Sequence, residues 1–157
     1  MNAFKKLILP MVAVVMFFSS CKDDDPVAPA ATLYDELGGT AMVADPNNAG
    51  SQIEKGRLGI RSVVDSTIFI IAGDSRLTKF FPVLLSEVGA GNLSGFSALS
   101  KNLTDFISIG AGAKNYTYSG KNMKDTHDPA KNSRMAEKAA NADMDAFIDD
   151  VVKGAKK

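Results

Sequence analysis

Residues 60–71 read IRSVVDSTIFII, and this stretch decides between a helical fold and a β fold. The positions that repeat three or four residues apart, as on one face of a helix, are Ile60, Val63, Val64, Thr67, Ile68 and Ile71. The same β-branched and aromatic residues are also favourable in a strand. Because the run is about twelve residues long and Gly73 follows as a typical helix stop, we predict a helix.

The segment before this helix begins with a cap and ends in a turn. Thr32 stands three residues before Asp35, which is the pattern of a capping box, and Gly38-Gly39 supplies a left-handed stop. A short first helix is therefore expected. Residues 45–50, DPNNAG, are typical of a turn and predict a loop.

Three further helices are expected after residue 73. Asp74-Ser75 can cap a short helix through Phe81, and Pro82 prevents its simple continuation. Two longer apolar stripes at helical spacing follow: Phe96, Leu99, Leu103, Phe106 and Ile107, then Met144, Phe147, Ile148, Val151 and Val152 with Asn141 as N-cap. The fold class that this pattern predicts is all-α.

The first twenty residues are typical of an export signal. Lys5 and Lys6 precede an apolar run, residues 7–18, that is too short to span a bilayer. The sequence Phe18-Ser19-Ser20-Cys21 resembles a bacterial lipobox, whose cysteine is diacylated. We therefore expect a lipoprotein signal peptide over 1–20, the lipidated Cys21 with a disordered Pro- and Ala-rich tether over 21–31, and one domain over 32–157.

The composition and the predicted anchor limit the kinds of molecule that we expect the protein to bind. The 18 basic and 18 acidic residues balance and are interspersed, with no basic stripe and no Trp, which argues against nucleic-acid binding. About 126 residues after the tether suffice for one domain with one core. The lipobox implies a membrane anchor on an outer membrane lipoprotein of a Gram-negative bacterium, facing the periplasm or the surface. An ordinary secretory signal with an incidental cysteine is the alternative.

His127 is the only histidine, and its surroundings single it out. Residues 118–127, YSGKNMKDTH, resemble the stretch Tyr-Thr-Gly-x-x-Met-x-x-x-His of group I truncated haemoglobins, with the same spacing. Residues 33–39, LYDELGG, are similar to the family's opening helix and glycine pair. Residues 63–81 are similar to its second helix and aromatic pair, and residues 144–147 to the start of its last helix.

This resemblance implies a truncated-globin-like helical sandwich that holds haem b, with His127 as the ligand of the iron. A neutral imidazole donates a lone pair to the metal, while its other nitrogen is oriented by a hydrogen bond from Thr126 or to a backbone carbonyl. The residues expected around haem, by family position or helical stripe, are Phe81, Ile68, Leu99, Leu103, Phe106, Met123, Phe147 and Ile148. The alternative for these residues is an ordinary dry core.

The side of haem opposite His127 departs from the family. The tyrosine that usually donates a hydrogen bond to oxygen falls at Ile68, which has no donor. Alignment through Phe106 puts Ala98 and Asn102 at positions that often carry polar residues, which leaves Asn102 as the donor or as an exposed helix residue. Two loops are longer than in the family, before Ile60 and after His127.

Two other features suggest haem contacts. Met135, in the longer loop after His127, is a candidate second axial ligand. Lys121, Lys124 and Lys131 are candidate partners of the haem propionates, or are solvated surface lysines.

Three hypotheses of function follow from the resemblance. The first is a haem protein that binds a diatomic ligand, oxygen or nitric oxide, at the open iron site. The second is haem capture or carriage, or a structural lipoprotein without gas chemistry. The third is an enzyme, a nitric oxide dioxygenase or peroxidase, which ranks lower because an exported protein lacks direct access to nicotinamide-driven reductases. Fold resemblance alone does not separate them.

Overall fold

The computed structural model describes residues 29–157, so the expected signal peptide and Cys21 lie outside the described residues. Residues Ala31–Lys157 form one compact unit. Its elements are α1 (Leu33–Glu36), β1 (Met42–Ala44), β2 (Gln52–Glu54), α2 (Lys55–Ile71), α3 (Ser75–Thr78), α4 (Pro82–Gly89), α5 (Ser94–Gly110), α6 (Met123–Thr126) and α7 (Asn141–Gly154). The predicted helical class is confirmed, with one small sheet added to it.

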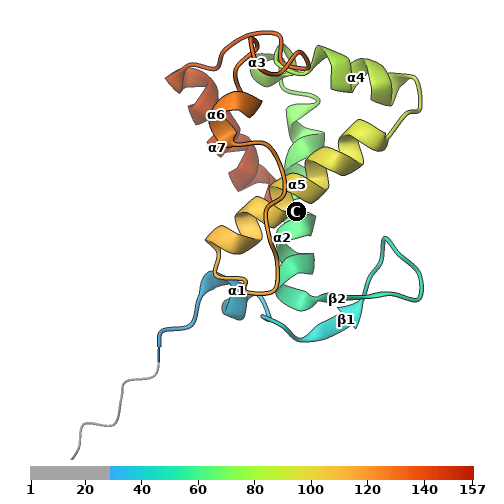
Figure 1. Ribbon diagram of the computed structural model, residues 1–157, viewed down its shortest axis with the longest axis vertical. Coiled ribbons are helices and arrows are strands. Elements are labelled where there is room, and N and C mark those ends of the chain that lie inside the picture. The colour runs from blue at the N-terminus through green and yellow to red at the C-terminus, as the bar shows by residue number, and fades with distance from the viewer. Residues whose placement is uncertain (1–28) are drawn as a thin grey trace, which may run out of the picture. The chain divides into compact units, whose positions relative to one another are not determined.

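Helix α2 is the centre of the unit, because α5 and α7 both pack against it (Figure 1). Its stripe Ile60, Val64 and Ile68 is buried with Tyr34 and Ala111 in what we call the α2–α5 cluster; the partly buried side chains packed on this cluster include Phe96, Leu99, Leu103 and Ile107. The helical spacing read from residues 60–71 therefore predicted the buried face.

A second apolar cluster lies near the C-terminal end of α2. Leu77, Phe80, Met135 and Ala146 are buried together, and we call them the α3–α7 cluster. The partly buried side chains that pack against it are Ile71, Phe81 and Phe147. The two clusters place α5 and α7 on different parts of one helix.

The start of the unit follows the predicted caps. The Thr32 hydroxyl accepts from the N–H of Asp35 at 3.2 Å, and the Asp35 carboxylate accepts from the N–H of Thr32 at 3.0 Å. Gly38 and Gly39 have φ of 108° and 54°, a conformation that side chains with Cβ rarely adopt. Helix α1 thus begins and ends where the sequence indicated.

The segment between α1 and α2 is an antiparallel hairpin and not only a loop. Val43 of β1 pairs with Ile53 of β2, and the predicted turn over residues 45–50 is the connection between the strands. Strands of three residues carry too little alternation to be read from the sequence.

Helix α3 ends at Thr78, three residues short of the predicted end at Phe81, and α4 begins at Pro82. The Asp74 carboxylate accepts from the N–H of Arg76 at 2.8 Å and caps α3 as predicted. Pro82 then occupies the first turn of α4, where a missing N–H has no cost. The proline that was expected only to stop a helix thus begins one, which the sequence analysis did not predict.

The two apolar stripes predicted from the sequence fall within α5 and α7. The predicted N-cap Asn141 is instead the first residue of α7, and the Asp143 carboxylate accepts from the N–H of Ala140 at 2.8 Å. No helix in the described part of the chain is long and apolar enough to cross a membrane.

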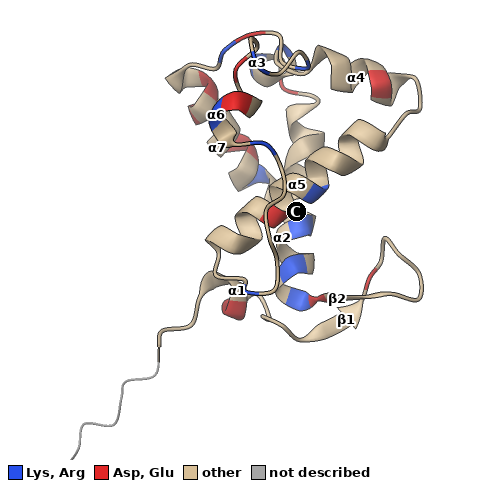
Figure 2. Cartoon of the chain, viewed as in Figure 1, with Lys and Arg blue, Asp and Glu red and all other residues tan. Residues whose placement is uncertain are grey.

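Basic residues gather on the N-terminal turns of α2 (Figure 2), where a buried polar network joins it to neighbouring segments. The hydroxyl of Tyr34 donates to Glu54 at 2.6 Å, and the amide of Asn115 donates to the other Glu54 oxygen at 2.7 Å. Arg57 pairs with Asp105 of α5 at 2.6 Å. These bonds fix the end of α2 that lies beside the hairpin.

Candidate functional site: the His127 imidazole and the surfaces of α5 and α7

His127 follows directly after α6, a single helical turn. Asn122 is the N-cap, and its side-chain oxygen accepts from the N–H of Asp125 at 2.9 Å. The imidazole Nδ1 lies 2.8 Å from the carbonyl oxygen of Met123, one turn earlier. Of the two orienting partners that the sequence allowed, the carbonyl makes the contact; the Thr126 hydroxyl donates to the carbonyl of Asn122 at 2.9 Å.

The contact with Met123 decides which ring nitrogen carries the proton. A carbonyl oxygen only accepts hydrogen bonds, so Nδ1 of His127 is the donor. In the neutral ring Nε2 then has its lone pair free. This is the arrangement in which histidine ligates metals, with one nitrogen held by a carbonyl and the other directed at the metal.

His127 is exposed, and the turn that carries it has few neighbours. Within residues 29–157, α6 makes no extensive contact with another helix or strand. The imidazole is therefore accessible to a ligand from outside the protein.

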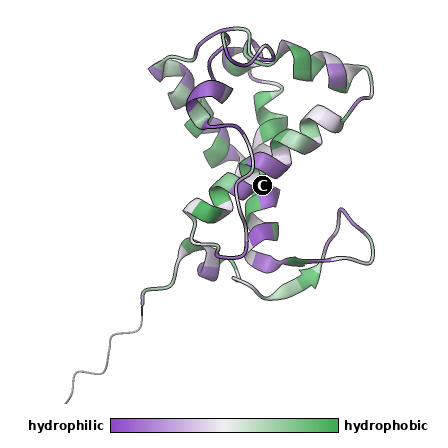
Figure 3. Cartoon of the chain, viewed as in Figure 1, coloured by the Kyte–Doolittle hydropathy of each residue, from purple (hydrophilic) through white to green (hydrophobic). Residues whose placement is uncertain are grey.

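Helices α5 and α7 leave apolar surface uncovered. Both pack on α2, but in the described chain they have no extensive contact with each other (Figure 1). Phe106 of α5 is 45% exposed, and Met144 and Ile148 of α7 are 56% and 51% exposed. The hydropathy colouring of Figure 3 shows green segments on both helices, beside the hydrophilic chain that leads to α6. These side chains are available to a ligand or partner that would cover them.

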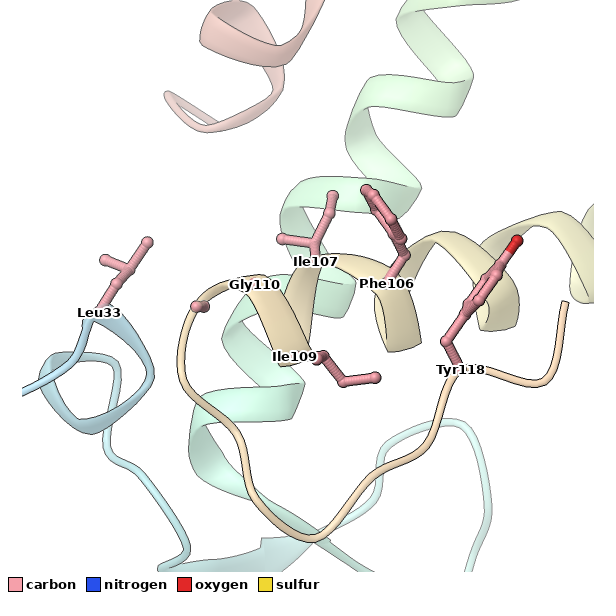
Figure 4. A pocket seen from close by; sticks show the side chains of 7 residues that line it. Leu33, Phe106, Ile107, Ile109, Gly110 and Tyr118 are labelled. Carbon is pink, nitrogen blue, oxygen red and sulfur yellow. The ribbon is translucent and has the colours of Figure 1, made fainter. Parts of the chain in front are cut away.

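A cavity of about 530 Å³ lies at the C-terminal end of α5, and apolar side chains form most of its lining. Figure 4 shows Phe106 and Ile107 pointing to the same side of α5, with Tyr118 beside Phe106. The two rings meet edge to face, with centroids 5.7 Å apart. The size falls in the range of small-molecule sites, which take up apolar ligands with a few polar contacts.

The expected haem contacts fall into three groups. Ile68, Leu99 and Leu103 belong to or pack on the α2–α5 cluster, as an ordinary core would have them. Phe81 and Phe147 pack on the α3–α7 cluster. Phe106 lines the cavity at the end of α5. The backbone carbonyl oxygen of Met123 bonds to Nδ1 of His127.

The remaining candidates are placed as follows. Asn102 is partly buried on α5, while Lys121, Lys124 and Lys131 are exposed. Met135 is only 9% exposed and belongs to the α3–α7 cluster, so its thioether is packed in that cluster. Swinging it onto an iron atom would require unpacking that core.

Besides Phe106, the cavity is lined by residues that sequence reasoning did not assign to the site: Leu33, Ile107, Ile109, Gly110, Ala111 and Tyr118. Tyr118 is the first residue of the motif that ends at His127, so its position in that motif was the available signal. Nothing in the sequence pairs Leu33 with the end of α5.

His127 supplies the kind of ligand that haem iron takes, but it is not among the residues that line the cavity or form the two apolar clusters. An imidazole with a free Nε2 lone pair is the single protein ligand that haem iron needs, and flat apolar surface is what the macrocycle requires. No cluster of three or more His, Cys, Asp or Glu side chains among residues 29–157 could hold a bare metal ion. Held within a macrocycle, a metal needs no such cluster.

Comparisons with known proteins add no family assignment. No family model matches the chain, and no match was found among the curated proteins or the solved structures.

Proposed function

We propose that residues 32–157 form a truncated-globin-like domain that binds haem b through Nε2 of His127 and holds a diatomic ligand, oxygen or nitric oxide. The observation that carries this proposal is the 2.8 Å contact between Nδ1 of His127 and the Met123 carbonyl oxygen. That contact leaves Nε2 as a free lone pair on an exposed ring, in a motif whose spacing matches the truncated haemoglobins.

Apolar side chains supply the second support. Haem buries a wide apolar surface when it binds, and each Å² removed from water contributes about 25 cal/mol. Phe106, Met144 and Ile148 are large side chains that the fold itself leaves half exposed. Their coverage by a ligand would recover this free energy.

The polarity of the side of haem opposite His127 affects how firmly a diatomic ligand is held. When bound, haem supplies an iron atom that coordinates a small ligand on the face away from the histidine. Ile68 is buried among apolar side chains and donates no hydrogen bond, so the proposal assigns the role of donor to Asn102, which is partly buried on α5. We therefore expect weaker retention of oxygen than in relatives with the tyrosine.

Anchoring through Cys21 is part of the proposal. The lipobox would hold the domain at the outer membrane on a tether of about ten residues, in the periplasm or on the surface. Mass spectrometry of the protein isolated from membranes tests it: acyl groups on Cys21 are expected, and a free N-terminal peptide would contradict it.

The test of haem binding is a titration of residues 22–157 with haemin, with His127→Ala beside the wild type. Ultraviolet-visible spectra are recorded in ferric, ferrous and carbonmonoxy forms. We expect a stoichiometric Soret band that shifts with carbon monoxide, is lost or altered in His127→Ala, and is restored by added imidazole.

Ser133→Ala is the matched control, because Ser133 is exposed in the segment that follows His127. Its spectra should equal those of the wild type. A wild type without a specific Soret band, or a band indifferent to His127, would refute the proposal.

Haem carriage is the second candidate, and the exposure of His127 favours it. A ligand held by an exposed imidazole leaves more readily than one enclosed by the protein. Rapid transfer of haem to apo-myoglobin would support carriage. Retention over hours would support the gas-binding role.

A further inference from the structure

Residues 128–140, which join α6 to α7, form an ordered segment with its own hydrogen bonds. The N–H groups of Lys131 and Asn132 both donate to the carbonyl of Asp128 at 2.8 Å. The N–H of Met135 donates to the carbonyl of Asn132 at 3.0 Å. Although the sequence marks this stretch only as a loop longer than in the family, its middle is a compact turn.

The segment is anchored to the body of the domain chiefly through Met135 and Arg134, and Glu137 adds an exposed ion pair with Lys79 at 3.5 Å. Met135 is buried with Leu77, Phe80 and Ala146 in the α3–α7 cluster. Arg134 makes a two-pronged ion pair with Glu87 of α4, with N–O distances of 2.8 and 2.5 Å, and this pair lowers the pKa of Glu87. Two-pronged arginine–carboxylate pairs fix direction as well as distance.

Asn132 connects this anchored segment to the residue before His127. Its side-chain Nδ2 donates to the carbonyl oxygen of Thr126 at 2.8 Å, in a partly buried position. Its Oδ1 accepts from the N–H of Arg134 at 3.2 Å. One amide side chain therefore bonds α6 on one side and the anchored turn on the other.

The Thr126 carbonyl belongs to the peptide unit that ends at the Cα of His127. Because that unit is planar, a bond that holds the Thr126 oxygen also holds the nitrogen and Cα of His127, from which the imidazole extends. Helix α6 is a single turn without extensive packing on another helix in the described chain, and a helix of this length is not stable by itself. The Nδ1 bond to Met123 orients the imidazole relative to α6, and bonds such as that from Asn132 hold α6 itself.

We propose that Asn132 is a positioning residue that sets the direction of the His127 imidazole, and that residues 128–140 transmit this restraint from α4 and the α3–α7 cluster. The inference rests on the proposed ligation of haem by His127. Asn132 touches neither haem nor the imidazole, and acts through the Thr126 carbonyl.

The first test uses the protein without haem. Backbone amide exchange at Thr126 and His127 is measured by NMR in the wild type, Asn132→Ala, Asn132→Asp and Ser133→Ala. The aspartate keeps the shape of Asn132 but lacks the Nδ2–H donor. We expect faster exchange in both Asn132 variants and none of this change in Ser133→Ala. Equal exchange in all four proteins would overturn the restraint on α6.

The second test uses the haem-loaded protein. The iron–histidine stretching band is recorded by resonance Raman in the ferrous state, together with haem affinity. We expect the band to shift in both Asn132 variants and haem affinity to fall on the order of tenfold, as for other supporting residues of metal ligands. An unchanged band with normal haem content would overturn the positioning role.

The two proposals fail in different ways. Absence of haem binding through His127 in the wild type defeats the proposed function, whereas the exchange test still judges the Asn132 bond. Should both Asn132 variants fail to fold, Arg134→Gln takes their place, because it removes only a solvent-facing ion pair. In haem-loaded, ferrous Arg134→Gln we expect the iron–histidine band to shift by less than the shift expected for the Asn132 variants. An unshifted band would overturn the proposal that the restraint on His127 is transmitted from α4.

Discussion

The hydroxyl of Tyr34 donates a 2.6 Å hydrogen bond to Glu54 across the junction of α1 and β2, and both residues are buried. Burial and this bond raise the pKa of Tyr34, so the hydroxyl stays protonated over the range of folding experiments. Glu54 also accepts from Asn115 at 2.7 Å. The carboxylate thus collects two donors at the N-terminal end of α2.

Tyr34→Phe removes one of these donors and is expected to destabilise the fold. A buried carboxylate left short of a partner costs about 1–3 kcal/mol, measured as the free energy of unfolding in urea. Tyr118→Phe is the control, because its hydroxyl donates to the Lys121 carbonyl at an exposed position; a loss within about 0.5 kcal/mol is expected. Equal losses of unfolding free energy in Tyr34→Phe and Tyr118→Phe would contradict a stabilising role of the Tyr34–Glu54 hydrogen bond.

Gly154→Ala and Gly110→Ala form a matched pair, because each glycine is the last residue of a helix. A Cβ at Gly154 would come within 3.0 Å of the Thr67 backbone nitrogen, whereas one at Gly110 meets nothing within 4 Å. We expect Gly154→Ala to cost about 1–3 kcal/mol and Gly110→Ala to be neutral or slightly stabilising. Thermal melts measure both; equal melting temperatures would mean that α7 shifts freely on α2.

Asp74 is expected to contribute to acid sensitivity. Hydrogen bonds from the Arg76 side chain and N–H lower the pKa of Asp74 to about 2, below its usual value of 3.8. A group with a lowered pKa in the fold stabilises above 3.8, and this stabilisation is lost as the pH falls towards 2. The melting temperature of Asp74→Asn should therefore fall less steeply than that of the wild type between these values.

Asp145→Asn controls for the loss of a charge on the surface, because Asp145 is exposed on α7. Its acid profile should run parallel to that of the wild type. Circular dichroism melts at intervals from pH 6 to about 2 distinguish the profiles. An Asp74→Asn profile parallel to the wild type would disprove the assignment.

Asn102→Leu tests the polar donor of the proposed gas site. Removing one hydrogen bond from the ligand is expected to speed oxygen release by up to about tenfold, since a net hydrogen bond contributes roughly 0.5–1.5 kcal/mol. Stopped-flow release is the measurement, with the exposed Ser97→Ala on the same helix as control. A release rate unchanged by Asn102→Leu would place the amide away from the ligand.

Local signals in the sequence predicted most of the helical fold. The Thr32 capping box, the Asp74 cap and the apolar stripes of α2, α5 and α7 each depend on residues within one or two turns. The hairpin was missed because the pairing of Val43 with Ile53 spans a turn and leaves almost no alternation to read. Helix α4 was missed because Pro82 was interpreted only as a stop.

The sequence singled out His127, whose role as a ligand of iron stays a prediction, but it did not indicate the contacts around this residue. The motif around His127 indicated the imidazole, but the Met123 contact that fixes its tautomer is visible only in the structure. The same stripe that suggested haem contacts also forms the core, so spacing alone did not separate Leu103 from Phe106. The bond from Asn132 to Thr126 depends on how the longer loop folds back, which no local pattern encodes.

Helix α2 carries α5 and α7 on different parts of its length, and those two helices share no extensive interface in the described chain. A small rotation of either helix about α2 changes the spacing between them without breaking contacts that both helices share. The spacing between α5 and α7 is therefore set by how each of the two helices packs on α2. A side chain added at Gly154, far from His127 in the sequence, would change how α7 packs on α2 and thereby the spacing between α5 and α7.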